Sequence, residues 1–170
     1  MFLIKFLQSL VRALNSDGTP GQVAMGMALG AAFGLTPLLS LHNLVILAVA
    51  MLTTVSFPGV MLGWVLAVPF GFLLDPLFDA VGAALLGWDA LAPLWTWAVN
   101  TPVIALFRFN NTIVLGSLVT WLALLAPLFV ALRLLVRKYR ATVYQRLVRT
   151  RAFQYVRASK AWNVYLLFRP

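Results

Sequence analysis

Residues 112–136 read TIVLGSLVTWLALLAPLFVALRLLV, and this stretch decides the class of fold. Its only charged residue is Arg133. A helix of about 25 residues, at 1.5 Å per residue, is about 37 Å long, and the hydrocarbon core of a bilayer is roughly 30 Å thick. The stretch therefore predicts a transmembrane helix, and Pro127 marks a position where this helix can kink.

The composition of the whole chain points the same way. Hydrophobic residues make up 62% of the 170 residues and charged residues only 10%, whereas a soluble domain has about 25% charged residues. The mean hydropathy is +0.94. A single domain of this size cannot bury so much apolar surface in its own core. The composition therefore predicts an integral membrane protein.

The charges are segregated along the chain. Ten of the 13 Lys and Arg residues lie from Arg133 onward, while the four acidic residues, Asp17, Asp75, Asp79 and Asp89, lie earlier. Lys and Arg near the ends of spans stay in the cytoplasm. Both termini are therefore expected on the cytoplasmic face of the membrane, with two or four full crossings and four preferred. The net charge of +9 alone also fits nucleic acid, but this placement favours a membrane and no nucleic acid.

Three regions follow from these patterns. Residues 1–15 are expected to form an interfacial amphipathic helix, because its leucines share one face: Leu3, Leu7, Leu10 and Leu14. Residues 19–136 are expected to form the transmembrane helical domain. Residues 137–170 predict a basic cytoplasmic helix that binds anionic lipid headgroups, with a dedicated partner-binding arm as the alternative.

Prolines divide the transmembrane region into short helices. A good N-cap residue followed by proline predicts a helix start, and four such pairs occur: Thr19-Pro20, Thr36-Pro37, Asp75-Pro76 and Thr101-Pro102. A further start is expected near Pro58. The segment 38–56 is long enough to cross, whereas 20–35, 58–74 and 77–87 are marginal or too short. They are re-entrant or discontinuous helices, or ordinary spans in a locally tilted or thinned bilayer.

The predicted fold class is therefore all-α. We expect a polytopic helical membrane protein with short, proline-broken or re-entrant helices and an amphipathic basic C-terminal helix.

Glycines recur every four residues in two segments. The first series is Gly26, Gly30 and Gly34, and the second is Gly59, Gly63 and Gly71, with Ala67 between the last two. Small residues at this spacing let two helices approach closely. We expect the two series to pack within the chain, and a homo-oligomer interface is the alternative.

A few polar side chains interrupt the apolar segments, and an ionisable residue there raises a functional hypothesis. Asp75 is expected to cap the helix that starts at Pro76, and Asp79 either suits that helix's dipole or carries function. Arg108, if buried, needs one of these two carboxylates. The candidate polar core comprises Ser40, His42, Asn43, Asp75, Asp79, Arg108, Asn110 and Asn111.

The residue inventory offers little for catalysis or metal binding. The chain has one histidine and no cysteine, which does not make a usual zinc site. His42 suits a proton relay or a structural hydrogen bond to a carbonyl. We therefore expect no enzyme activity, no metal and no cofactor.

Four ordered motifs carry a family resemblance: Leu14-Asn15-Ser16-Asp17, Gly34-Leu35-Thr36-Pro37-Leu38-Leu39-Ser40-Leu41-His42-Asn43 (with TPLLSLHN), Leu74-Asp75-Pro76-Leu77-Phe78 and Arg108-Phe109-Asn110-Asn111-Thr112 (RFNNT). They resemble a family of small, uncharacterised bacterial inner-membrane proteins, related to a widespread polytopic domain of unknown function. The resemblance covers roughly residues 10–136. It implies an envelope setting and a large membrane-anchored partner encoded alongside.

Two functional hypotheses follow. The first is a non-enzymatic integral inner-membrane subunit that anchors or gates a larger envelope assembly, with lipid handling as a candidate task. The alternative is a small transporter or channel that uses intramembrane Asp79, His42 and Arg108.

Overall fold

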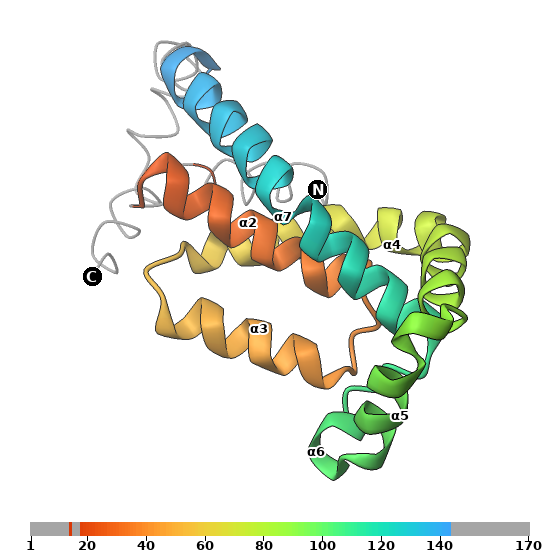
Figure 1. Cartoon of the computed structure of the whole chain (residues 1–170). Helices are drawn as coiled ribbons and strands as arrows, with labels where there is room; N and C mark the ends of the chain where they lie inside the picture. The colour runs from red at the N-terminus through yellow and green to blue at the C-terminus, as the bar shows by residue number, and fades with distance from the viewer. Residues whose placement is uncertain (1–13, 15–17, 144–170) are drawn as a thin grey trace, which may run out of the picture.

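The helix α2 (Pro20–Leu35) lies at the centre of the bundle, between α4 (Phe57–Leu86) and α7 (Thr112–Lys138) (Figure 1). The computed structural model describes Leu14 and residues 18–143. Every regular element in these residues is a helix, the others being α3 (Leu41–Leu52), η1 (Asp89–Leu91), α5 (Ala92–Asn100), α6 (Pro102–Ala105) and the π-helix η2 (Tyr139–Val143). The all-α class is therefore confirmed.

The start of α2 follows the sequence prediction. Thr19 is its N-cap, and Pro20 is its first residue. The Thr19 hydroxyl accepts a bond from the Gln22 backbone N–H at 3.2 Å, while the Gln22 side chain accepts one from the Thr19 N–H at 2.7 Å. Two N–H groups that the first turn leaves open are satisfied in this way.

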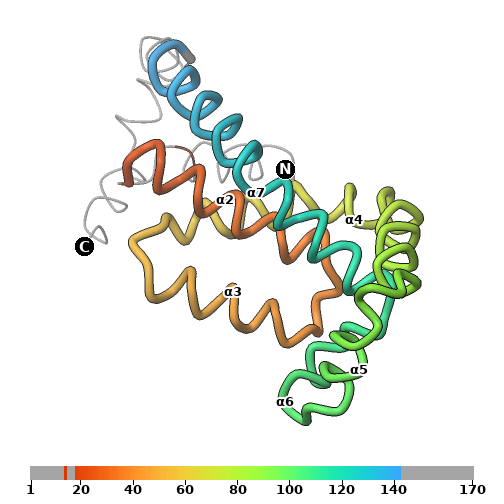
Figure 2. The backbone as a smooth tube through the Cα atoms, in the orientation of Figure 1, coloured from red at the N-terminus to blue at the C-terminus, as the bar shows by residue number. Residues whose placement is uncertain are grey.

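The helix α4 is continuous where two helices were expected. It runs through Pro69 and Pro76, so the predicted helix start near residue 76 is wrong, and Asp75 is not a cap. Each proline removes one backbone donor and crowds the preceding turn, which bends a helix without ending it when packing holds both sides. Figure 2 shows the resulting bend of α4 before the chain reaches α5.

The helix α3 is shorter than expected. It starts at Leu41 instead of near Pro37, and it has 12 residues, or about 18 Å at 1.5 Å per residue. The prediction that residues 38–56 form a helix long enough to cross is therefore wrong. By contrast, the starts at Pro20 and Pro102 agree with the prediction, and α7 covers the expected 112–136 stretch.

The two glycine series face each other across α2 and α4. A Cβ at Gly30 would overlap the Val60 carbonyl oxygen, and one at Gly63 would overlap that of Met27. The contacts of the other four glycines follow the same order along both helices, from Gly26 and Gly59 to Gly34 and Gly71. The two helices are therefore parallel, and their backbones touch where larger side chains would hold them apart.

The helix α7 runs antiparallel to α2 and α4 and covers their other side. Near its start, a Cβ at Gly116 would overlap the Phe78 carbonyl oxygen of α4. Farther along, the Trp121 indole donates to the Ala28 carbonyl of α2 at 2.9 Å. Trp121 also packs in the largest buried cluster, with residues of α2, α3 and α4: Leu29, Ala32, Ile46, Ala50 and Val60.

Two stretches in the described part of the chain are long and apolar enough to cross a membrane, judged by length and composition alone: Phe57–Leu86 and Thr112–Thr142. In the most apolar window of each, only 33% and 28% of the residues are buried inside the protein. Most of their side chains therefore face outward.

Two predicted regions lie largely outside the residues that the structure describes. The expected amphipathic helix 1–15 is represented only by Leu14, which is buried among Val23, Met27, Leu62 and Val136. The expected tail helix 137–170 is described only to residue 143. Its described part consists of the end of α7 and of η2, which follows α7 directly.

The backbone contact between α2 and α4 is tested by adding one methyl group. Gly30→Ala should lower the free energy of unfolding by about 1–3 kcal/mol, because the new Cβ must displace backbone atoms. Gly21→Ala, in the same helix, is the matched control, since its Cβ would meet only the Thr19 hydroxyl at 3.7 Å. Chemical unfolding in detergent measures both, and equal effects would contradict this packing.

Candidate functional site

The polar segment Thr36–Asn43 joins α2 to α3 and folds back on itself. The Asn43 side-chain amide donates to the carbonyls of Pro37 and Leu38 at 3.0 and 3.3 Å. The Thr36 hydroxyl shares its proton between the Ala32 carbonyl (2.8 Å) and Asn43 Oδ1 (3.0 Å). Both Thr36 and Asn43 are buried. These bonds hold residues 37–40 in a turn, which explains why α3 starts only at Leu41.

The N-terminus of α3 lacks a side-chain cap. Ser40 occupies the N-cap position, but its hydroxyl donates to the Pro37 carbonyl at 2.6 Å and makes no bond to the first turn of α3. The first turn also contains no acidic residue. Its N–H groups therefore keep the partial positive charge of a helix N-terminus.

His42 lies in that first turn and is 4% exposed. Neither ring nitrogen has a hydrogen-bond partner in the described part of the chain. A buried polar group without a partner costs about 1–3 kcal/mol, so such a group calls for a specific explanation. The sequence suggested a structural hydrogen bond from His42 to a carbonyl as one of two roles. Within the described residues, His42 does not make this bond.

The two acidic residues of α4 behave differently from the sequence expectation. Asp79 is exposed and accepts a hydrogen bond from the Thr112 hydroxyl, at the start of α7. Asp75 is half-buried one turn earlier in the same helix. Asp79 therefore joins α4 to the N-terminus of α7, where a negative charge also suits the helix dipole.

Arg108 stands in a tight turn before α7. Its φ of 55° lies in the left-handed region, which costs a residue with a side chain roughly 1–2 kcal/mol. The turn is closed by bonds from the Arg108 N–H to the Ala105 carbonyl and from the Asn111 N–H to the Arg108 carbonyl. Arg108 is exposed and, within the described residues, pairs with neither Asp75 nor Asp79.

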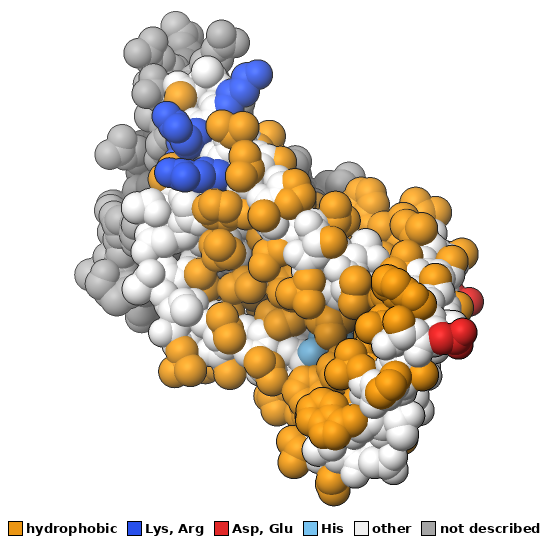
Figure 3. Space-filling model, in the orientation of Figure 1, with side chains coloured by type: hydrophobic (Ala, Val, Ile, Leu, Met, Phe, Trp, Pro, Cys, Tyr) orange, Lys and Arg blue, Asp and Glu red, His pale blue; other side chains and the backbone are white. Residues whose placement is uncertain are grey.

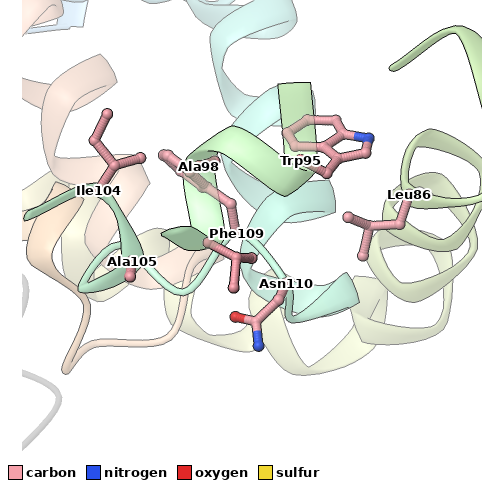
Figure 4. Close-up of a pocket in the computed structure, with 8 residues that line it drawn as sticks. Leu86, Trp95, Ala98, Ile104, Ala105, Phe109 and Asn110 are labelled. Atoms are coloured by element: carbon pink, nitrogen blue, oxygen red, sulfur yellow. The ribbon is translucent and has the colours of Figure 1, made fainter. Parts of the chain in front are cut away.

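The asparagines of the same turn have separate roles. Asn111 is the N-cap of α7, and its side chain accepts a bond from the Val114 N–H at 3.0 Å. Asn110 lines a shallow apolar cavity of about 110 Å³ beside Leu86, Trp95 and Phe109 (Figure 4). The predicted polar core is therefore divided. Ser40, His42 and Asn43 gather at the α2–α3 turn, and the other residues lie near the α4–α7 junction.

Charge is separated between the two ends of the bundle. Figure 3 shows basic side chains gathered at one end and acidic ones at the opposite edge. At the basic end, Arg133, Arg137 and Lys138 of α7 are exposed. Arg140 instead donates to the carbonyls of Leu14 and Gly18, at 2.9 and 2.8 Å, and so joins the end of α7 to the segment before α2.

Several important residues escaped the sequence analysis. Gly82 and Gly116 make the α4–α7 contact as closely as the two predicted series make the α2–α4 contact. A glycine inside an apolar helix was the available signal for both. Trp121 gave a weaker signal. It lies near the middle of the predicted transmembrane stretch 112–136, whereas tryptophans usually lie at the ends of such stretches. No local pattern marks Arg140.

Comparison with known proteins agrees with the motifs. Residues 4–144 match the bacterial family described as "Uncharacterized protein conserved in bacteria (DUF2062)". The chain belongs to this family. An "Uncharacterized protein" of Treponema pallidum (strain Nichols) is 30% identical over 158 residues, which cover 91% of this chain and 96% of that protein. No solved structure matches the chain significantly.

The bonding of the α2–α3 turn predicts the effect of removing its amide. Asn43→Ala should destabilise the protein by about 1–3 kcal/mol, because two carbonyls and the Thr36 hydroxyl lose partners in a part-buried place. Asn100→Ala is the control, since Asn100 is exposed and bonds only the Thr96 carbonyl of its own helix. Thermal unfolding of both variants measures the difference, and an Asn43→Ala protein as stable as the control would refute this role.

Proposed function

We propose that this chain is a non-enzymatic integral protein of the bacterial inner membrane that anchors or gates a larger envelope assembly, with lipid handling as its candidate task. The observation that carries the membrane placement is the outward apolar surface. Leu39 is 94% exposed, Phe72 76% and Leu73 73%. Water does not tolerate a continuous apolar surface of this kind, whereas lipid does.

Helix lengths support a definite topology. The helix α4 measures about 45 Å along its path and α7 about 40 Å, so each can cross roughly 30 Å of hydrocarbon. The helices α2 and α3, at about 24 and 18 Å, are too short to cross. They form a hairpin that enters and leaves on one side. Of the two counts that the sequence left open, these lengths favour two full crossings.

The basic end supports the orientation. The starts of α2 and α4 lie together, because the Ser56 N–H donates to the Gln22 carbonyl at 3.1 Å. Arg140 joins the end of α7 to the same region through Gly18. Arg133, Arg137 and Lys138 at this end favour the cytoplasmic face by the positive-inside rule, where they would also attract anionic lipid headgroups.

The anchoring role is supported by how the polar groups are used. Four polar side chains make bonds that join two elements or cap a helix: Asp79, Asn43, Asn111 and Trp121. Arg108, by contrast, is exposed at the surface. In the described part of the chain the helices pack closely, and many large apolar side chains are exposed on their outer faces. Such a protein is suited to hold a larger partner through its exposed helix faces. The transporter alternative is favoured by one observation, the unpartnered His42.

The topology is tested by labelling single cysteines, because the chain has none of its own. In intact spheroplasts, a membrane-impermeant maleimide should label Trp97→Cys and leave Lys138→Cys unlabelled until the inner face is opened. Leu39→Cys should stay protected from both sides. Labelling of Leu39→Cys from outside would show that the α2–α3 hairpin crosses completely, and labelling of Lys138→Cys from outside would refute the orientation.

The anchoring role is tested by photo-crosslinking in cells. A crosslinking amino acid is placed at an outward residue of each outer helix, Leu44 of α3, Val65 of α4 and Leu124 of α7, with the buried Val23 as the control. We expect one helix face to give a single high-mass protein adduct and Val23 to give none. Lipid adducts alone at every position would refute anchoring, and proteoliposome flux that falls in His42→Ala and Asp79→Asn would favour the transporter.

A further inference from the structure

We propose that the first turn of α3, with His42 as its side-chain ligand, binds an oxyanion such as the phosphate of a membrane lipid. The inference uses the membrane placement proposed above and needs no protein partner. Two independent observations meet at this turn. Within the described residues, one is a helix N-terminus without a side-chain cap, and the other is a buried histidine without a hydrogen-bond partner.

The helix end is left open by the turn before it. The two side chains that usually cap such an end are used elsewhere, because Ser40 bonds the Pro37 carbonyl and Asn43 bonds the carbonyls of Pro37 and Leu38. The N–H groups of Leu41 and His42 therefore remain as donors for an anion. Broken helices within membranes present their N-termini to anionic groups in the same way.

His42 is placed to complete the site. The Cα–Cβ bond of a helical residue tilts toward the helix N-terminus, which directs the His42 side chain toward the N-terminal side of its own turn. A ring nitrogen that carries hydrogen donates to an oxyanion, in addition to the backbone N–H groups. Asp79 of α4 is not a competing ligand, since it bonds Thr112 at the start of α7.

The surroundings favour an amphiphile over a free anion. Leu38 and Leu39 beside the turn are 52% and 94% exposed, so they offer an apolar surface to acyl chains. The first turn of α3 lies near the end of α2. The length of α2 puts it about 24 Å from the basic end, where α2 starts. In a hydrocarbon core of roughly 30 Å, this depth is within reach of headgroups of the opposite leaflet.

Access to the ring requires the start of α3 to move outward. The helix α3 contacts the bundle through Ile46 and Ala50, while Leu44, Val45 and Val49 on its other face are exposed. Because only one face of α3 is packed, a shift of its first turn, together with the turn of residues 37–40 that Asn43 bonds, exposes the ring. Phosphate bonds to the ring and to the N–H groups then replace the unpartnered state.

The test uses the full chain in a non-ionic detergent and a short-chain phospholipid, dihexanoyl phosphatidylglycerol. Dihexanoylglycerol, which lacks the phosphate, and inorganic phosphate are the comparison ligands. We expect saturable binding of the phospholipid, at least ten-fold weaker binding of dihexanoylglycerol, and a loss of at least ten-fold in His42→Ala. Asn100→Ala, whose exposed side chain bonds the Thr96 carbonyl of its own helix, should change the affinity less than two-fold.

A second measurement needs no variant. The chain has one histidine, so ¹⁵N-labelled histidine gives ring signals that require no assignment. These signals should shift during the phospholipid titration and stay unchanged with dihexanoylglycerol. Equal, His42-dependent binding of inorganic phosphate would assign the site to a free anion and overturn the lipid source. Unchanged ring signals, or equal phospholipid binding by wild type and His42→Ala, would overturn the site itself, whatever the crosslinking and labelling experiments show.

Discussion

The contact between the backbones of α2 and α4 is the constraint on which the rest of the structure depends. Six glycines in two helices remove the side chains that would hold the backbones apart. Close approach brings many atoms within van der Waals distance, and this is the main force between helices when the surroundings are as apolar as the helices themselves. The contact makes α2 the buried centre of the bundle, although α2 is too short to span a membrane.

The other contacts build on this pair. With α2 and α4 side by side, their common surface receives α7, which closes against it through Gly116 and through the Trp121 bond to the Ala28 carbonyl. The parallel direction of α2 and α4 requires the chain to return between them, and α3 makes this return. The turn before α3 must reverse the chain within residues 36–40, and buried Thr36 and Asn43 supply its hydrogen bonds.

The candidate site is a by-product of that reversal. Side chains that satisfy the carbonyls of the turn are no longer free to cap the next helix, so the first turn of α3 stays open beside His42. A protein can leave a buried polar group unpaired only if other interactions offset the cost, and such groups concentrate where function needs them. The α4–α7 junction differs, because Asp79 and Thr112 bond each other and Asn111 caps the start of α7, so these residues serve mainly to join α4 to α7.

The sequence alone determined three features: the apolar, all-helical class, the α7 stretch, and the glycine spacing at which two helices can pack. These features follow from residue composition and spacing, which are read directly along the chain. It misjudged Pro76 as a helix start and Asp75 as a cap, since a proline ends or bends a helix according to the packing around it, which is not local. It proposed His42, Asp79 and Arg108 as candidate functional residues by their residue types. Only the tertiary structure decided that Asp79 bonds Thr112, that Arg108 is exposed and that His42 is buried without a hydrogen-bond partner among the described residues, because these outcomes depend on which helices meet.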